Sequence, residues 1–302
     1  VAQFAQGFPQ MAVLIADARL SRDPEVGKLT DDVLAKKLLG ENSAIELSIL
    51  RGCSLFDNFG ISGNVSNHYE YIANKASKVS PSEFYACIKK FHKRGLIDIS
   101  GRYAQLVPKP LAVLLASDWW DQTHNEDHLS LLEEMPDQLV QPFCLQITML
   151  AFVPEVQKLT LTLCGPQGPF GQAEAILSNR GSLLLRSFVE VNPIATSSAL
   201  YGVLTNLSQI ELANISGEVR RNLVWALEKL VFHAHIFEGS AWCLMLMASA
   251  ENESYSNNAT GLFAQLFRVN LSGTEANFLL RLRLLNRAME LGNSSIDKAI
   301  IK

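Results

Sequence analysis

The sequence lacks the short motifs that mark the common classes of enzyme. It has no Gly-x-Ser-x-Gly nucleophile elbow, no Walker A loop and no Rossmann dinucleotide fingerprint. No pair of carboxylates stands out from the charges that helix surfaces normally carry. We therefore expect this chain to be non-catalytic and to hold no cofactor or metal of its own.

Long apolar runs are also absent. A membrane-spanning helix needs roughly 20 consecutive apolar residues, and the longest candidate here, residues 110–116, is far shorter. No secretory signal is visible at the start of the sequence. The sequence therefore predicts a cytoplasmic protein without a membrane partner.

Cysteine is scarce, and no two cysteines have the Cys-x-x-Cys spacing of a redox or zinc motif. The five that occur all lie in apolar segments: Cys53, Cys87, Cys144, Cys164 and Cys243. Such cysteines are usually buried free thiols in a reducing compartment. We expect the same of these five.

Charge is low and nearly balanced, with a net charge of -4. This argues against a protein whose whole surface is built for nucleic acid. A hydrophobic content of 48% indicates a packed globular protein, and 302 residues are enough for two or more domains. The sequence begins with Val1 rather than Met, so we expect it to be a fragment of a larger protein.

Residues 80–107 are the most informative stretch that is present. Ser80 is a good helix cap, Pro81 suits the first helical position, and Glu83 has the spacing of a capping box with Ser80. The apolar residues that follow recur at helical spacing and predict one buried stripe: Phe84, Cys87, Ile88 and Phe91. The sequence therefore predicts a capped, half-buried helix.

A hairpin is expected directly after this helix. Gly95 ends the helix, and two short apolar runs, 96–99 and 103–107, flank a Ser-Gly turn. A capped helix followed by a hairpin is the core of a winged helix. Winged helices bind DNA in some proteins and act as regulatory joints in certain ATPases.

Further segments complete this expected unit. Ser43 should begin a helix in which Ile45, Leu47, Ile49 and Leu50 are largely buried, and the Gly- and Asn-rich residues 56–67 should form a loop. A short helix is expected over 68–76, and another runs from Pro108 to Trp120. Residues from about 40 to 120 are thus predicted to form one winged-helix unit with a helical tail.

Helical segments with short breaks recur from residue 129 onward. The strongest are 181–190, 193–207, 217–232 and 239–250. Such a succession predicts an antiparallel array or a solenoid, although no strict repeat period is present. Residues 159–163 alternate as a strand would and precede a glycine-rich segment, 165–171. That segment has no Lys-Ser/Thr pair and its prolines lack N–H groups, so we expect a helix and a connector rather than a phosphate loop.

Basic side chains accompany the capped helix and the hairpin turn: Lys89, Lys90, Lys93, Arg94 and Arg102. In a DNA-binding winged helix they would contact phosphates. The exposed first turn of the helix offers only Ser82 and Tyr85, without the Asn, Gln or Arg that commonly read bases. The alternative hypothesis is therefore a winged-helix transcriptional regulator with a helical ligand-binding or dimerisation domain. Nucleic acid is a partner only under that alternative.

Two histidine pairs are candidate metal ligands. His124 and His128 would share one face of a helix, and His233 and His235 lie close together. No third ligand is evident beside either pair. We expect His124 and His128 to lie in a polar linker, and the other two to interact with the C-terminus of a helix.

Taken together, these segments resemble the regulatory half of a bacterial STAND-type signalling ATPase, a relative of AAA+, NACHT and NB-ARC proteins. Gly7-Phe8-Pro9 at the start of a helix resembles the Gly-x-Pro motif of that family's helical lid. Residues 44–120, including Lys-Arg-Gly-Leu-Ile-Asp at 93–98, are similar to the winged helix that follows the lid. Residues 248–274 look like the helical region that comes next in large bacterial members.

The resemblance implies a nucleotide-dependent switch. Gly7 and Pro9 would contact ATP or ADP in the parent protein, whose Walker motifs would lie in an upstream nucleotide-binding domain. His92 lies on the capped helix and does not match the ADP-contacting histidine of the family's winged helix. A protein partner or ligand sensed by the helical array would favour the open state.

The expected fold class is mainly α. A winged-helix domain with a short β-hairpin wing is followed by a solenoid-like α-helical array. The expected domains are a lid-like segment at 1–40, the winged helix at 41–125 and the array at 126–302.

Overall fold

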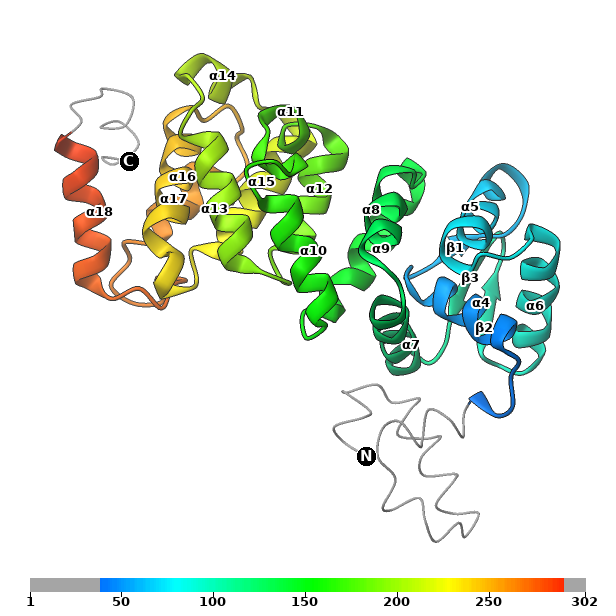
Figure 1. The fold of residues 1–302 in the computed structure, drawn as a ribbon. Helices are drawn as coiled ribbons and strands as arrows, with labels where there is room; N and C mark the ends of the chain where they lie inside the picture. Colours follow the sequence, from blue (N-terminus) through cyan, green and yellow to red (C-terminus); the bar gives the residue numbers. More distant parts are fainter. Residues whose placement is uncertain (1–38, 291–302) are drawn as a thin grey trace, which may run out of the picture. The chain divides into compact units, whose positions relative to one another are not determined.

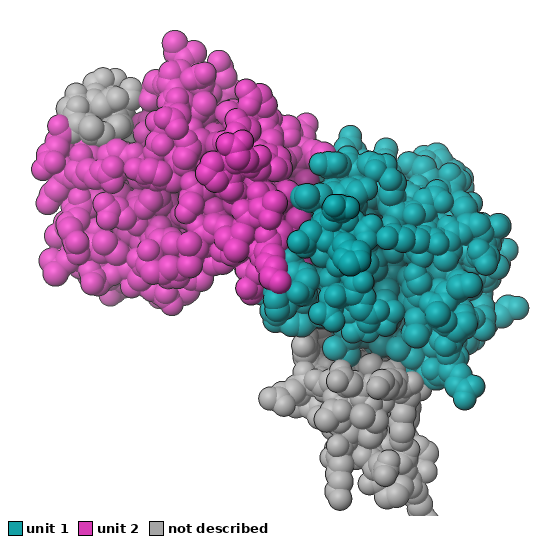
Figure 2. Space-filling view, viewed as in Figure 1, with its two compact units in different colours: residues 1–155 teal, residues 156–302 magenta. Residues whose placement is uncertain are grey.

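The computed structural model describes residues 39–290, which are mainly helical and include one small antiparallel sheet. The mainly helical class is thus confirmed. The chain divides into two compact units, residues 1–155 and residues 156–302 (Figure 2). Gly7 and Pro9, which belong to the expected lid-like segment, lie outside the described residues. The expected domain limits stay predictions.

The first unit combines helices with the sheet (Figure 1). Its elements are α4 (Ala44–Ser54), β1 (Phe59–Gly60), α5 (Asn67–Tyr71), α6 (Pro81–Lys93), β2 (Ile97–Ser100), β3 (Tyr103–Leu106), α7 (Lys109–Gln122), α8 (Asn125–Glu133) and α9 (Asp137–Ile147). A π-helical turn continues α5 over Ile72–Ser77. Helices α8 and α9, which we expected to open the helical array, belong to this unit.

The sheet has the strand order β1-β3-β2, with β3 antiparallel to both neighbours. Ile97 pairs with Leu106 and Phe59 pairs with Ala104, and all four side chains are buried. Side chains alternate between the two faces of a strand, so Asp98 on the same sheet is exposed. The expected hairpin is confirmed, and β1 adds a third strand to it.

Helix α6 begins as the sequence predicts, but its capping box is incomplete. The Ser80 hydroxyl accepts a hydrogen bond from the backbone N–H of Glu83 at 3.3 Å. The Glu83 carboxylate accepts from the Ser80 hydroxyl at 3.0 Å rather than from its backbone N–H. The full reciprocal box forms instead at the start of α4, between Ser43 and Glu46. Both helices are therefore fixed at their first turn by a serine cap.

The apolar stripe of α6 packs into the core of the first unit. Phe84, Ile88 and Phe91 are fully buried, and Cys87 at the edge of the stripe is half-buried. The ring of Phe84 meets that of Phe59 on β1 edge-on, at 6.2 Å between centroids. Burial of three large side chains on one face makes this helix part of the unit's hydrophobic core.

Two local expectations for this unit are wrong. Ile45 is 48% exposed, because it lies in the first turn of α4 on the face away from the core. Residues 56–67 are not only loop, since they contain β1 and a short 3₁₀ turn at Gly63–Val65. The two-residue strand is too short to leave an alternating pattern.

The second unit is built from helices with short connections (Figure 1). Helix α10 (Pro154–Cys164) crosses the division between the units. It is followed by α11 (Ala173–Ile176), α12 (Asn179–Phe188), α13 (Pro193–Leu204), α14 (Gln209–Asn214), α15 (Gly217–Leu230), α16 (Phe237–Ser249), α17 (Ala259–Gln265) and α18 (Phe278–Glu290). The alternating residues 159–163 lie within α10, so the expected helix is confirmed over the strand alternative.

Helix α16 is the central element of the second unit. It contacts α13, α15, α17 and α18, and most of its side chains are buried. A helix that is apolar on all sides is typical of an interior position. Its neighbour α15 also packs against α12.

A buried arginine joins the ends of four helices in this unit. Arg220 on α15 is fully buried, and its guanidinium donates to the carbonyl oxygens of Leu212, Ile215 and Met247 at 2.6–3.3 Å. Its Nε donates to Glu251 at 3.2 Å. Glu251 in turn accepts the backbone N–H of Thr260 at the start of α17 at 2.9 Å. The charge of Arg220 is thus compensated, and α14, α15, α16 and α17 are fixed relative to one another.

Within residues 39–290, no single helix is long and apolar enough to cross a membrane. The pair Gly217–Leu230 and Ala234–Ser249 passes the same test of length and composition only when taken together, and it is bent by 119° at the break.

Candidate functional site

The basic side chains of α6 and of the β2–β3 turn are the first candidates for a binding surface. Lys89, Lys90, Lys93, Arg94 and Arg102 are all exposed on the first unit. Their exposure leaves the surface accessible. Several of them, however, already have partners within the unit.

Lys90 forms an ion pair with Glu46 of α4. The hydrogen bond from Lys90 and, to a smaller extent, the one from the backbone N–H of Ser43 hold the pKa of the Glu46 carboxyl below its ordinary value. Glu46 therefore has two roles, because the same carboxylate completes the capping box of α4. The pair ties the middle of α6 to the first turn of α4.

Arg94, at the end of α6, reaches the segment that leads into α4. Its guanidinium donates to the carbonyl oxygen of Leu39, and also to the side-chain oxygen of Asn42 at 2.7 Å. Asn42 is itself bonded to the Leu39 carbonyl at 2.8 Å. Arg94 thus fixes the chain where it enters the first unit.

The other three basic residues differ in the contacts that they form. The Lys89 ammonium lies over the ring of Tyr85, 4.6 Å from its centroid. Arg102 donates to the side-chain oxygen of Asn64 at 2.7 Å. Lys93 forms no ion pair or hydrogen bond with any residue in the described part of the chain. Of the basic surface, Lys89 and Lys93 are therefore the side chains most available to a partner.

Sequence reasoning did not find the acceptors of these interactions. The Ser-x-x-Glu spacing at 43–46 marks Glu46 as a capping residue. Nothing in the sequence pairs it with Lys90, which lies 44 residues further along the chain. The Leu39 carbonyl is a backbone atom, and only the fold brings it to Arg94.

The two histidines of the first pair lie in different surroundings. Helix α8 begins at Asn125, so His124 precedes it and is exposed, whereas His128 is buried. The Nε2 of His128 lies 2.8 Å from the Thr123 hydroxyl, which itself donates to the Trp119 carbonyl. Nε2 must then carry the proton and donate to Thr123. His128 therefore belongs to the core rather than to a polar linker.

The described residues 39–290 contain no group of three or more His, Cys, Asp or Glu side chains that would hold a metal ion. His233 and His235 follow the end of α15, with ring centroids 5.8 Å apart. Another histidine, His68, is buried, and its Nδ1 accepts the backbone N–H of Gly60 at 3.1 Å. Burial lowers the pKa of both His68 and His128.

The glycine-rich segment after α10 has its own internal hydrogen bonds. The N–H of Gly168 donates to the Gly165 carbonyl at 2.9 Å, and the N–H of Gly171 donates to the Gly168 carbonyl at 3.0 Å. A phosphate-binding loop needs such N–H groups directed at the ligand. The segment is a connector containing one 3₁₀ turn, Pro169–Gly171.

Comparison of the chain with known protein families, with curated proteins and with solved structures found no match.

Proposed function

We propose that this chain is the non-catalytic regulatory and sensor part of a STAND-type signalling ATPase. Residues 41–125 form a winged-helix hinge, and residues 126–302 form a solenoid-like array that binds a protein partner or ligand. ATP or ADP binds the upstream nucleotide-binding domain, with Gly7 and Pro9 as lid contacts. The parent protein works in the cytoplasm, in keeping with its five free cysteines.

The winged-helix assignment is supported by the order of elements in the first unit. Capped helix α6 leads through Gly95 directly into the β2–β3 hairpin, and β1 pairs with the outer side of β3. The positive φ of Gly95, 72°, lets the chain reverse there at no steric cost. This is the arrangement from which we infer a wing formed by β2 and β3.

The hinge proposal depends mainly on the contacts that Lys90 and Arg94 form. Both hold the segment 39–46, through which the expected lid connects to the first unit. A movement of the lid would therefore first change the contacts of α6. A joint of this kind transmits a nucleotide state when its contacts differ between the two states.

The coding sequence that precedes Val1 gives the first test. A Gly-x-x-x-x-Gly-Lys-Ser/Thr loop there is the expected result. An upstream region without any phosphate-binding loop would overturn the proposal.

Hydrogen–deuterium exchange of the parent protein tests the hinge itself. We expect the exchange of residues 39–54 and 81–94 to differ between the ADP-bound and ATP-analogue-bound protein. Arg94→Ala should reduce this difference by at least half, because it removes the tie to Leu39. Lys93→Ala is the matched control, since Lys93 has no such tie, and it should leave the difference intact. An equal effect of the two variants would count against a hinge at α6.

The transcriptional regulator remains a second candidate, favoured by the exposure of Lys89 and Lys93 on α6. Acidic residues outnumber basic ones over 39–155, and this opposes binding to a polyanion. Fluorescence anisotropy with a labelled duplex at low and at physiological salt decides the matter. Salt-sensitive binding that is lost in Lys89→Glu/Lys93→Glu but kept in Lys75→Glu/Lys78→Glu would favour the regulator.

A further inference from the structure

The three-stranded sheet of the first unit has a hollow of about 310 Å³ on its surface. The hollow lies over β2 and β3 and reaches the residue before β1 (Figure 1). It is lined by Asn58, Asp98, Ser100, Tyr103, Ala104 and Gln105. Side chains alternate between the two faces of a strand, and the apolar ones of these strands are turned to the core. The hollow therefore belongs to the outer face of the sheet.

The strand register brings the polar side chains of this face into two rows. Asp98 pairs with Gln105, and Ser100 pairs with Tyr103. The register of β1 against β3 places Asn58, just before β1, on the other side of Gln105. Directly opposed residues of an antiparallel pair have Cβ atoms about 4.5–5.5 Å apart. One row thus runs from Asn58 through Gln105 to Asp98, and the ring of Tyr103 belongs to the next row.

The amide N–H groups of the first row are already bonded to carboxylates. The Nδ2 of Asn58 donates to Asp57 at 3.2 Å, and the Nε2 of Gln105 donates to Oδ2 of Asp98 at 3.4 Å. Only the nitrogen of an amide donates to a carboxylate, so both amide oxygens remain as acceptors. Neither they nor Oδ1 of Asp98 accept a hydrogen bond from the described residues, and Asp98 has no ion pair there. The hollow therefore offers one carboxylate and two amide oxygens to a ligand.

A guanidinium group is the natural complement of such a surface. It carries a positive charge and five N–H donors in one plane, and it has no acceptor. The ring of Tyr103, which is 44% exposed, can stack on that plane. A lysine ammonium is a strongly hydrated point charge and fits several separate acceptors less well. Phosphate is repelled, because the lining contains no basic side chain.

Strand β2, beside the hollow, is an edge of the sheet. The N–H of Val107 donates to the Leu96 carbonyl at 2.9 Å. Because bonded and non-bonded pairs alternate along an antiparallel ladder, Ile97 and Ile99 direct their backbone groups away from β3. The Ile97 carbonyl is bonded to Nδ1 of His92 at 2.9 Å. The N–H and C=O of Ile99 have no partner within residues 39–290, so they are open to a further strand.

The hollow suits a side chain of a protein better than a free small molecule. Asp98, Ser100 and Tyr103 are exposed, so a small ligand would stay largely in water, whereas small-molecule pockets enclose most of their ligand. A protein segment paired with β2 would be held through its backbone. A residue of that segment opposite Asp98 would point to the outer face, next to the carboxylate.

We propose that the outer face of the sheet binds an arginine side chain, which a protein partner presents on an extended segment paired with β2. The guanidinium donates to Asp98 and to the amide oxygens of Asn58 and Gln105, and it stacks on Tyr103. The inference does not depend on the nucleotide-dependent function, because the surface belongs to the first unit alone.

Saturation-transfer NMR of the full chain with the peptide acetyl-Thr-Val-Arg-Val-Thr-amide tests the proposal. In a strand added to β2, the arginine points to the outer face and the two valines direct their N–H groups at β2. We expect a Kd of about 0.1–1 mM, because the contact is small and exposed. Citrulline in place of the arginine keeps the shape without the charge and should weaken binding about 10-fold. Lysine should also weaken it, and N-methylation of both valines should abolish it.

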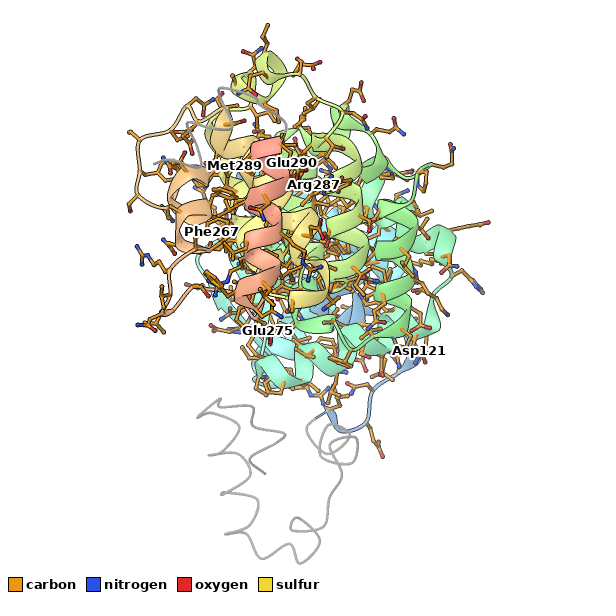
Figure 3. All side chains as sticks on the ribbon, turned by 90° about the vertical axis from the view of Figure 1, so that its left-hand side faces the viewer. Asp121, Phe267, Glu275, Arg287, Met289 and Glu290 are labelled. Atoms are coloured by element: carbon orange, nitrogen blue, oxygen red, sulfur yellow. The ribbon has the colours of Figure 1, made fainter. Side chains whose placement is uncertain are left out.

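Variants of the protein locate the site. Asp98→Asn should weaken binding of the arginine peptide about 10-fold. Tyr103→Leu should weaken it about 3-fold, whereas Tyr103→Phe keeps the ring and should bind as the wild type does. Asp121→Asn is the matched control. Asp121, near the end of α7 (Figure 3), is exposed, lies outside the hollow and has no ion pair in the described part of the chain. Circular dichroism confirms that each variant is folded.

Several results would overturn the proposal. The first is a wild-type chain that binds no peptide at millimolar concentration, and the second is full binding by Asp98→Asn. The third is equal binding of the arginine and citrulline peptides. Ethylguanidinium that binds as tightly as the peptide would assign the hollow to free guanidine compounds instead. Self-association that the peptide disrupts and Asp98→Asn lacks, measured by sedimentation velocity, would assign it to a second copy of this chain.

Discussion

Replacement of Arg220 is the most demanding test of the second unit. Arg220→Ala removes a fully buried guanidinium that donates to three backbone carbonyls and to Glu251. Those carbonyls lose a charged donor, and the Glu251 carboxylate is left partly buried without its counterion. The substitution also leaves a cavity where four helix ends meet.

The expected cost follows from these losses. Breaking a buried ion pair by removal of one partner typically costs about 3–5 kcal/mol. One kcal/mol shifts the melting temperature of a domain of this size by about 2–4 °C. We therefore expect Arg220→Ala to lower the melting temperature of the second unit by about 6–20 °C. Arg220→Lys should recover little of this, because one ammonium group cannot replace the planar guanidinium at four acceptors.

Thermal and urea unfolding followed by circular dichroism measure the loss. Hydrogen–deuterium exchange locates it, and the ends of α14, α15, α16 and α17 should lose protection first. The neighbour Arg221 is the matched control. Its side chain is 43% exposed and, among the described residues, it pairs only with Glu218, at 3.7 Å, so Arg221→Ala should cost less than about 1 kcal/mol. Equal stability of Arg220→Ala and Arg221→Ala would refute the reasoning.

The remaining predictions concern the first unit. Phe91→Ala should cost about 3–5 kcal/mol in urea unfolding, because Phe91 is fully buried; a wild-type midpoint would contradict its place in the core. Ser80→Ala should cost on the order of 1 kcal/mol through loss of the α6 cap, and an unchanged free energy of unfolding would show that the cap contributes nothing. Burial lowers the pKa of His68 and His128 below the value of about 6.5 that the unfolded chain has. Their contribution to stability is therefore complete above about pH 6.5 and is lost as the pH falls through the folded-state pKa values. Urea midpoints measured between pH 5 and 8 should show this fall, and it should be smaller in His68→Gln/His128→Gln; an equal fall in that variant would exclude the histidines as its cause.

Much of the local structure was predictable from short-range patterns. The cap at Ser80, the stripe of Phe84, Ile88 and Phe91, and the hairpin after Gly95 each depend on residues within one or two turns of one another. Capping and helical periodicity act over such distances. The errors at Ile45 and in residues 56–67 arose where burial or pairing depends on distant segments.

The candidate sites were less predictable. The sequence marks Lys89, Lys90, Lys93 and Arg94 as one basic group. In the structure Lys90 and Arg94 hold residues 39–46, whereas Lys89 and Lys93 form no ion pair with the described residues. No motif in the sequence marks Val269 and Leu271, because their exposure depends on the packing around them.

The sequence by itself thus determined a mainly helical chain, the approximate positions of its strongest helices and the position of the β2–β3 hairpin, because these depend on neighbouring residues. Only the tertiary structure decided which polar side chains form contacts within the protein. From the sequence alone, Arg220 would be placed among the charged residues on the exposed face of an amphipathic helix. Arg220 is buried because folding brings the Met247 carbonyl and the Glu251 carboxylate to its guanidinium. A charged group enters the interior of a protein only where such acceptors compensate for the hydration that it loses.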